Sequence, residues 1–269
     1  MLGDSPERDY SKKLHSFEEF AAPELRRIIN DLCLEEESVV LDVGCGTGLG
    51  TQLLRAHAAR VIGVDLSLPH VRAAGRSEGG AGFVVADARR LPFPDHAFDV
   101  VWACNSLNHL SNPERALRDL WLSLRPAGRL VVAQSHLLPE MFFAWDYHLD
   151  ARVRSACHEY YRAKYGLTTS DTASSTRLLG IVREAGFTEV RPRTYVLERF
   201  APLSEGDVEY LLGLYEAYWG EKLRPFLSEE DWRRLQHLCD PESEEFSLRR
   251  DDFHYLQTLS VVEGRRPEA

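Results

Sequence analysis

The sequence is poor in three features that mark other classes of protein: paired cysteines, long apolar runs and basic charge. Its five cysteines are odd in number and widely spaced, with no Cys-x-x-Cys pair, so we expect neither a disulfide framework nor a structural zinc site. Purely apolar runs reach only four or five residues, which is too short to span a bilayer. The sequence therefore predicts no metal site and no transmembrane segment.

Basic residues are outnumbered, with 32 Lys and Arg against 42 Asp and Glu and a formal net charge of −10. An acidic surface repels phosphate backbones and anionic lipid headgroups, so we expect no nucleic-acid partner and no membrane binding. Residues 1–8 show no basic flank followed by an apolar stretch, and hence no secretory signal. Together with unpaired cysteines, this predicts a cytoplasmic protein.

Short β-branched stretches alternate with helical patterns along the chain, without two-residue hairpin turns. This alternation favours an α/β fold, in which a mostly parallel sheet is covered by helices on both faces. Ser67 is placed to cap the helix that follows the second strand. The expected strands are residues 39–43, 61–64, 83–86, 98–103, 129–134, 189–197 and 254–262.

The most informative segment is the run Asp42-Val43-Gly44-Cys45-Gly46-Thr47-Gly48, between an expected strand and an expected helix. Glycines at such a junction allow a tight turn and let the backbone approach a ligand closely. The glycines fall at 44, 46, 48 and 50, which does not meet the Gly-x-Gly-x-x-Gly spacing of dinucleotide sites. The Gly-Lys-Ser/Thr ending of phosphate-binding loops is also missing, so nucleotide triphosphate hydrolysis is not expected.

Two acidic residues end the next two expected strands. Asp65 lies 19 residues after Gly46, a distance at which a carboxylate accepts hydrogen bonds from the hydroxyls of an adenosine ribose. Asp87, followed by Ala88, occupies a place suited to the adenine edge. These carboxylates would repel a pyrophosphate, but they suit a ligand that carries a sulfonium and an amine.

These features resemble the class I S-adenosylmethionine-dependent methyltransferases, in particular the branch of ubiquinone, menaquinone and small-molecule (natural-product) methyltransferases. The resemblance covers residues 35–135. It rests on the glycine loop and on the segments Val64-Asp65-Leu66-Ser67, Ala86-Asp87-Ala88, Leu91-Pro92-Phe93, Phe98-Asp99-Val100-Val101 and Leu124-Arg125-Pro126-Ala127-Gly128-Arg129-Leu130. It implies a Rossmann-like seven-stranded sheet whose last strand is antiparallel.

The resemblance also implies the residues that bind S-adenosylmethionine. Asp65 would bind the ribose, Asp87 would lie near the adenine and Asn105 near the methionine part. Asp42 either contacts the ligand or only braces the loop, and the segment at Tyr10 either folds over the cofactor or is a solvated helix start. The expected cofactor-binding residues are Tyr10, Asp42, Gly44, Cys45, Gly46, Thr47, Gly48, Asp65, Leu66, Asp87, Ala88 and Asn105.

Two long interruptions of the strand–helix alternation are expected to form a helical cap, because connections in such folds usually take a handful of residues. Of the 27 aromatic residues, 16 fall in these interruptions, residues 136–173 and 198–253. They either form the core of the cap or line a pocket for an aromatic or polyketide-like acceptor. The expected parts are an N-terminal helical segment, 1–34; a methyltransferase core, 35–135 with 174–198 and 253–269; and acceptor-binding insertions, 136–173 and 199–252.

The acceptor site is expected to include Trp145, Tyr147, Tyr161 and Tyr218. Transfer to a phenol, an enol or a ring carbon requires a base, whereas an unprotonated amine does not. The candidate bases are His109, just beyond the fourth strand, and His136, at the end of the fifth, because the carboxyl ends of the strands face the ligand crevice.

The sequence thus predicts an S-adenosylmethionine-dependent methyltransferase acting on a small molecule, with transfer to oxygen, nitrogen or carbon left open, as is the oligomeric state. A non-catalytic cofactor-binding subunit is the alternative. An NAD-dependent oxidoreductase is disfavoured by the glycine spacing. A nucleic-acid acceptor is disfavoured by the acidic charge and by the lack of an Asn/Asp-Pro-Pro-Tyr/Phe motif.

Overall fold

The computed structural model describes residues 9, 11–76, 81–110, 113–135, 141–142, 145–165 and 174–268, so two residues of interest, Tyr10 and His136, lie outside it. The chain divides into two compact units. Unit 1 comprises residues 1–135, 174–195 and 259–269, and unit 2 comprises residues 136–173 and 196–258.

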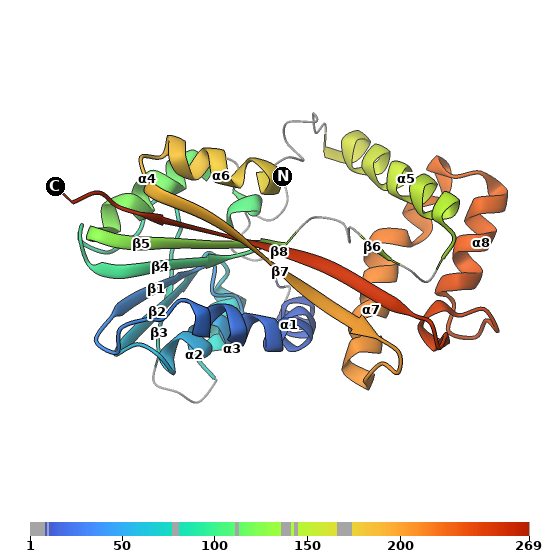
Figure 1. Ribbon diagram of the computed structural model, residues 1–269, viewed down its shortest axis with the longest axis horizontal. Helices are drawn as coiled ribbons and strands as arrows, with labels where there is room; N and C mark the ends of the chain where they lie inside the picture. The colour runs from blue at the N-terminus through green and yellow to red at the C-terminus, as the bar shows by residue number, and fades with distance from the viewer. Residues whose placement is uncertain are drawn as a thin grey trace. The chain divides into compact units, whose positions relative to one another are not determined.

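A mostly parallel sheet, with a glycine loop after its first strand, forms the centre of unit 1 (Figure 1). Five parallel strands pair in the order β3-β2-β1-β4-β5, and β8 adds to β5 in the antiparallel direction. β7 and the two-residue β6 also pair with β8. The predicted fold class, with an antiparallel last strand, is therefore confirmed. The strands are β1 (Val39–Val43), β2 (Arg60–Asp65), β3 (Gly82–Val85), β4 (Phe98–Cys104), β5 (Leu124–Ser135), β6 (Met141–Phe142), β7 (Thr188–Phe200) and β8 (His254–Arg265).

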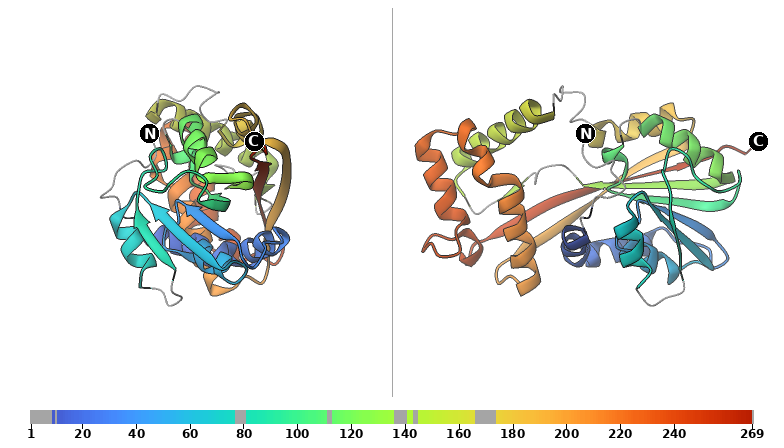
Figure 2. Two further views of the ribbon diagram at one scale, coloured as in Figure 1. Left: turned by 90° about the vertical axis from the view of Figure 1, so that its left-hand side faces the viewer. Right: turned by 180° about the vertical axis from the view of Figure 1, so that it is seen from behind.

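Helices cover both faces of the sheet in unit 1, with α4 and α6 on one face and α1, α2 and α3 on the other (Figures 1 and 2). The α4–α6 side buries a core in which Leu117, Leu120 and Val182 pack on strand residues such as Val101 and Val132. Burial on both faces explains why the strands are nearly continuous apolar runs. The helices of this unit are α1 (Ser11–Asp31), α2 (Leu49–Arg55), α3 (Leu68–Ala74), α4 (Pro113–Ser123) and α6 (Ser174–Glu184).

Local sequence signals account for where these elements begin. The Ser67 side chain accepts a hydrogen bond from the His70 backbone N–H at 3.3 Å, with Pro69 in the first turn of α3, so the predicted helix cap is confirmed. The fifth strand differs from its prediction, because β5 begins at Leu124 rather than at Arg129. A register shift between Phe98 and Val100 accommodates the extra residues.

Ala127 lies in that early part of β5 with a φ of 61°, where a side chain is disfavoured. We expect Ala127→Gly to raise the free energy of unfolding by about 0.5–1 kcal/mol, since glycine adopts this conformation without strain. The same exchange at the exposed Ala163, inside α5 of unit 2, should lower stability by about 0.5–1 kcal/mol. Urea unfolding of both variants measures the two changes in stability. A loss of stability in Ala127→Gly would contradict the prediction that the backbone at Ala127 is strained.

Unit 2 is built from helices and from parts of the long strands. Arg152 on α5 donates to both carboxylate oxygens of Asp231 on α8, at 2.8 and 2.7 Å. Aromatic and aliphatic side chains such as Trp219, Leu235 and Phe246 are buried between the elements. Its helices are α5 (Tyr147–Tyr165), α7 (Glu205–Trp219) and α8 (Glu229–Cys239), with short 3-10 turns η2 (Glu221–Phe226) and η3 (Ser247–Arg249).

Candidate functional site

The glycine loop turns sharply at the carboxyl end of β1. Gly44, Gly46 and Gly48 have positive φ angles of 70°, 53° and 97°, a conformation that favours glycine. The backbone N–H groups of Gly44 and Cys45 donate to the Val64 carbonyl at 2.7 and 3.0 Å. The loop is therefore fixed to β2 by its own backbone.

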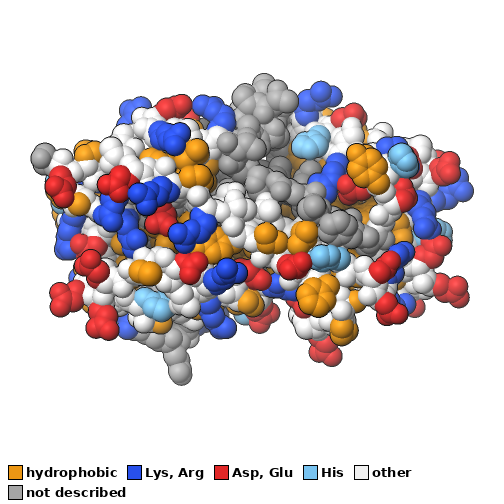
Figure 3. Space-filling model, viewed as in Figure 1, with side chains coloured by type: hydrophobic (Ala, Val, Ile, Leu, Met, Phe, Trp, Pro, Cys, Tyr) orange, Lys and Arg blue, Asp and Glu red, His pale blue; other side chains and the backbone are white. Residues whose placement is uncertain are grey.

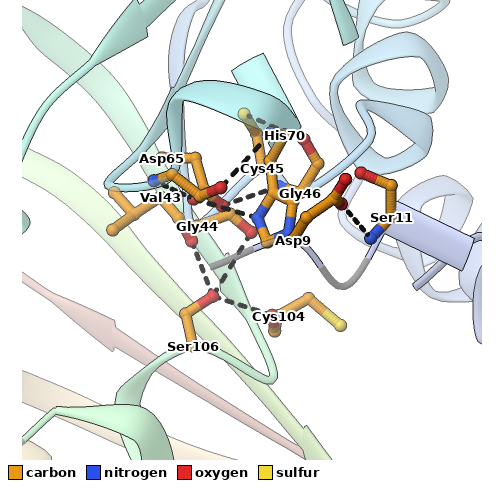
Figure 4. A network of polar contacts seen from close by, with 11 residues as sticks. Asp9, Ser11, Val43, Gly44, Cys45, Gly46, Asp65, His70, Cys104 and Ser106 are labelled. Carbon is orange, nitrogen blue, oxygen red and sulfur yellow. Dashed lines mark hydrogen bonds and ion pairs between the residues drawn. The ribbon is translucent and has the colours of Figure 1, made fainter. Parts of the chain in front are cut away.

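Ser106, just after β4, packs against the loop from the other side (Figure 4). Its hydroxyl donates to the carbonyls of Val43 and Cys104, at 2.9 and 2.8 Å. A Cβ on Gly44 would lie only 2.2 Å from the Ser106 Oγ, so this close approach requires glycine.

Asp65, at the end of β2, fastens the loop to the start of α3. Its Oδ2 accepts a hydrogen bond from the Gly46 N–H at 3.0 Å, and its Oδ1 accepts one from the Ser67 N–H at 2.8 Å. The His70 Nδ1 lies 3.3 Å from Oδ1 (Figure 4). A carboxylate offers about four acceptor positions, so roughly one remains, on Oδ2, for a ligand hydroxyl.

Asp42 lies beneath the loop and is only 2% exposed. Its Oδ2 accepts a hydrogen bond from the Thr51 hydroxyl at 2.6 Å. Burial raises the pKa of Asp42 to about 7, and the charges of Glu18 and Asp65 add to this rise, while the Thr51 hydrogen bond opposes it. In the structure Asp42 therefore braces β1 and α2 beneath the loop through its contact with Thr51.

Glu18, on α1, reaches the same loop. Its Oε2 accepts a hydrogen bond from the Thr47 hydroxyl at 2.5 Å, and burial raises the pKa of its carboxyl. Together with Asp42 and Asp65 it gives the loop an acidic environment. A cationic ligand fits such surroundings, since each carboxylate stabilises a nearby positive charge.

The other expected cofactor residues lie at the strand ends that follow. Asp87 is held by Arg89, which donates from Nε and Nη2 to its two oxygens at 2.9 and 2.8 Å, and this pairing lowers the pKa of Asp87. Its carboxylate is thus engaged within its own turn. Ala88 packs against the core of unit 1 and Leu66 is half-buried beside Asp65.

Asn105, at the end of β4, is directed toward β5. Its Oδ1 accepts hydrogen bonds from the Ser135 N–H at 2.8 Å, the Ser135 hydroxyl at 2.7 Å and the Gln134 side-chain amide at 3.0 Å. The amide oxygen therefore ties β4 to β5 near the glycine loop.

Of the two candidate bases, His136 lies outside the described residues. His109 ends the 3-10 turn η1 (Leu107–His109), which follows β4, and its side chain is exposed. Its backbone N–H donates to the Ser106 carbonyl at 3.1 Å. The turn therefore connects His109 to the residue that packs on Gly44.

The four aromatic candidates lie in unit 2 in different surroundings. Trp145 packs edge-on against Trp219, with ring centroids 4.9 Å apart. Tyr147 is 80% exposed. Tyr161 and Tyr218 contact the Lys222 ammonium, which lies 5.6 and 5.9 Å from their ring centres.

Three residues around the loop have roles that the sequence alone did not indicate: Glu18, His70 and Ser106. The contact between His70 and Asp65 could have been inferred from their spacing. Ser67 caps the helix that follows β2, so the first turn of this helix, which carries His70, lies next to the end of the strand. Glu18 precedes Thr47 by 29 residues, and nothing in the sequence indicates that pairing.

Two further observations concern the described residues as a set. Among them, groups of three or more His, Cys, Asp or Glu arranged to hold a metal ion are absent. Within the same part of the chain, none of the helices is long and apolar enough to cross a membrane.

Fold and site together define a class of protein. A parallel sheet with an antiparallel last strand, a glycine loop after β1 and a carboxylate at the end of β2 that contacts this loop are the features of a Rossmann-like methyltransferase.

Comparisons with known proteins support this class. Residues 41–132 match the family model described as "Methyltransferase domain". The demethylmenaquinone methyltransferase of Thermus thermophilus is 36% identical over 152 residues, which is 54% of this chain and 68% of that protein. The 27-O-demethylrifamycin SV methyltransferase of Amycolatopsis mediterranei is 35% identical over 120 residues, 42% of this chain and 44% of that protein. The chain belongs to the class I S-adenosylmethionine-dependent methyltransferase family.

A solved structure with the same fold is that of the YcgJ protein of Bacillus subtilis, at 18% identity and a TM-score of 0.59, covering 92% of this chain and 100% of that one. The chain spans less than half the length of several of the curated relatives that it matches, 36–47% in three of them. The family model covers residues 41–132, and the segments 136–173 and 199–252 lie outside this range.

Proposed function

We propose that the protein transfers a methyl group from S-adenosylmethionine to a small molecule, aromatic or polyketide-like, at oxygen, nitrogen or carbon. The observation that supports this most directly is the glycine loop with Asp65 bound to the Gly46 N–H and two further carboxylates, Asp42 and Glu18, beside it. The relatives named above are a menaquinone-type and a natural-product methyltransferase, which supports a small-molecule acceptor.

The residues of the loop suit this cofactor. Gly46 and Gly48 adopt positive φ angles, which glycine allows without strain and which give the loop its sharp turn. Asp65 retains an acceptor position for a ribose hydroxyl. The cofactor supplies a methyl group on a sulfonium, with a neutral thioether as leaving group. Because that group leaves readily, the chain has mainly to hold the acceptor within about 3–3.5 Å of the methyl carbon and to exclude water.

A general base is required only for acceptors that must lose a proton. His109 and His136 are proposed for that role, and the insertions at residues 136–173 and 199–252 are proposed to bind the acceptor. Tyr147 is the strongest aromatic candidate, because its ring is 80% exposed, whereas Trp145 packs against other rings.

Nucleic acid is not proposed as an acceptor. The net charge is −10, and on the face shown in Figure 3 Lys and Arg side chains are interspersed with Asp and Glu. Such a surface opposes the counterion release that drives nucleic-acid binding.

The test is release of S-adenosylhomocysteine when the purified protein is incubated with S-adenosylmethionine and a panel of phenols, quinols and amines. Acceptor-dependent release is the expected result. The second candidate is a cofactor-binding protein without turnover, because the contacts of Asp65 and Glu18 with the glycine loop concern cofactor binding and not methyl transfer itself. Calorimetric binding of the cofactor with no release across the whole panel would support that candidate instead.

Asp65→Ala is expected to weaken S-adenosylmethionine binding at least about tenfold. It removes a charge-assisted hydrogen bond to the ribose as well as the acceptor that holds the Gly46 N–H, and a hydrogen bond to a charged group contributes roughly 1.5–3 kcal/mol. Asp252→Ala is the matched control, because Asp252 is exposed and pairs with Arg250 at the surface of unit 2. Calorimetry showing the same dissociation constant for Asp65→Ala and wild type would remove Asp65 from the cofactor site.

A further inference from the structure

Glu18 places a carboxylate directly over the glycine loop. A Cβ built on Gly46 would lie 3.3 Å from the Leu14 Cδ1 and 3.5 Å from the Glu18 Oε1, so α1 packs closely over the loop at this point and brings the carboxylate to it. The other oxygen accepts the Thr47 hydroxyl hydrogen bond at 2.5 Å. The Glu18 carboxylate therefore lies in direct contact with the glycine loop.

The charges around Glu18 are mostly negative. Asp42 on β1 interacts electrostatically with both Glu18 and Asp65. The two Cys thiols near these carboxyls are neutral, because burial raises the pKa values of both. Two histidines oppose this charge only in their protonated form. The titratable groups that face the Glu18 carboxylate and its neighbours are His15 on α1, His70 on α3, Asp42, Asp65, Cys45 and Cys104.

The two forms of the cofactor differ in charge at one atom. S-adenosylmethionine carries a sulfonium, whereas S-adenosylhomocysteine carries a neutral thioether, and the ammonium, carboxylate and adenosine are common to both. A carboxylate within several ångströms of a partly dehydrated cation attracts it by more than RT, since the effective dielectric constant near a protein surface is about 20. A negative charge at the glycine loop therefore stabilises bound S-adenosylmethionine more than bound S-adenosylhomocysteine.

We propose that Glu18 is a specificity-determining residue of the glycine-loop site, whose negative charge makes the chain bind S-adenosylmethionine in preference to S-adenosylhomocysteine. The inference rests on the function proposed above and deepens it, because Glu18 sets the selectivity of the same site. Loss of the sulfonium charge on methyl transfer then removes an attraction that holds the cofactor, which promotes release of the product.

The test is isothermal titration calorimetry of both ligands with wild type, Glu18→Gln and Glu19→Gln. Glutamine keeps the size of the side chain and an acceptor for the Thr47 hydroxyl, but removes the charge. We expect Glu18→Gln to weaken S-adenosylmethionine on the order of tenfold and S-adenosylhomocysteine by less than about threefold. Glu19 is the matched control, because it is the next residue of α1 and is exposed, with His15 at 3.3 Å; Glu19→Gln should behave as wild type.

The pH dependence of the wild type provides a second measurement, independent of any substitution. Burial raises the pKa of Asp42 to about 7 and raises the pKa of Glu18 in the same direction. The carboxyl of Asp42, which interacts electrostatically with Glu18, therefore loses its proton as the pH rises from about 6 to about 8. The preference for S-adenosylmethionine should therefore increase over this range, and its binding should release protons, detected as a dependence of the binding enthalpy on the buffer.

Each alternative result decides against the inference. If Glu18→Gln weakens the binding of both ligands equally, Glu18 interacts with a chemical group that the two ligands share. If it weakens the binding of neither, Glu18 lies outside the cofactor site. A wild-type preference that does not change with pH would also overturn the inference. If the wild type binds neither ligand, the proposed function itself fails. Binding of both with an unaltered ratio in Glu18→Gln leaves that function in place and removes only the role of Glu18.

Discussion

Replacing Gly44 by alanine should lower the free energy of unfolding by about 2–5 kcal/mol and abolish measurable binding of S-adenosylmethionine. Gly44 has a φ of 70°, which costs a side-chain-bearing residue about 1–2 kcal/mol. The new methyl group would also lie 2.2 Å from the Ser106 Oγ and 2.7 Å from the Ser106 Cβ, and such overpacking costs about 1–3 kcal/mol. Urea unfolding and calorimetry measure the two effects.

A matched control exists in unit 2. Gly213 lies inside α7 and is exposed, and a methyl group added there would have no other heavy atom within 4 Å beyond its own turn of helix. Gly213→Ala should therefore raise stability by about 0.5–1 kcal/mol. Combining Gly44→Ala with Ser106→Gly should recover part of the loss, since the contact atoms are gone while the strained φ remains. A Gly44→Ala variant as stable as wild type would show that the loop relaxes away from β4.

Replacing Asp42 by asparagine should change how stability depends on pH, by up to about 4 kcal/mol between pH 4 and pH 8. The pKa of Asp42 is raised from 3.8 to about 7 in the folded protein, so the folded state binds the proton more tightly than the unfolded state does. The stabilisation from this group is fully present below pH 3.8 and is lost as the pH rises toward 7. Asparagine carries no charge at any pH, and it keeps an acceptor for the Thr51 hydroxyl.

Unfolding free energies of wild type and Asp42→Asn, measured at several pH values, give the difference directly. The asparagine variant should gain on the wild type as the pH increases, and the gain should level off above about pH 7. An exposed carboxyl offers the control: Asp251→Asn, at the surface of unit 2, should leave the pH profile unaltered. Parallel profiles for Asp42→Asn and wild type would mean that water or a cation reaches Asp42 in the folded state.

Periodicity and turn chemistry were sufficient to predict the fold class. Buried parallel strands are nearly continuous apolar runs, so residues 39–43 and 98–103 could be recognised as strands from their own sequence. Ser67 likewise has the residue type and position of a helix cap. The limits of β5 were less predictable, because the register shift between Phe98 and Val100 depends on a neighbouring strand. Local sequence contains no information about such a shift.

The site was predictable in its backbone and less so in its side chains. Glycine spacing indicated the loop, but the partner of each carboxylate depends on tertiary contacts. Asp87 ends a strand as expected, yet its oxygens bind Arg89, and the sequence could not decide between that pairing and a ligand. Glu18 joins the loop from a helix 29 residues away from Thr47. For the two insertions, the sequence showed only that aromatic residues are abundant. Which of these rings are buried depends on how the side chains pack in the folded protein.

The two units alternate along the chain, since unit 2 consists of residues 136–173 and 196–258 and unit 1 resumes between and after them. Strands β7 and β8 each contribute residues to both units. No single cut can therefore yield unit 2 as a fragment. On the acceptor-binding role proposed above for the insertions, a chimera that exchanges acceptor preference with a relative has to replace both segments at once, with four junctions, two of them inside strands. In evolutionary terms, the same connectivity lets the insertions diverge while the glycine loop is retained.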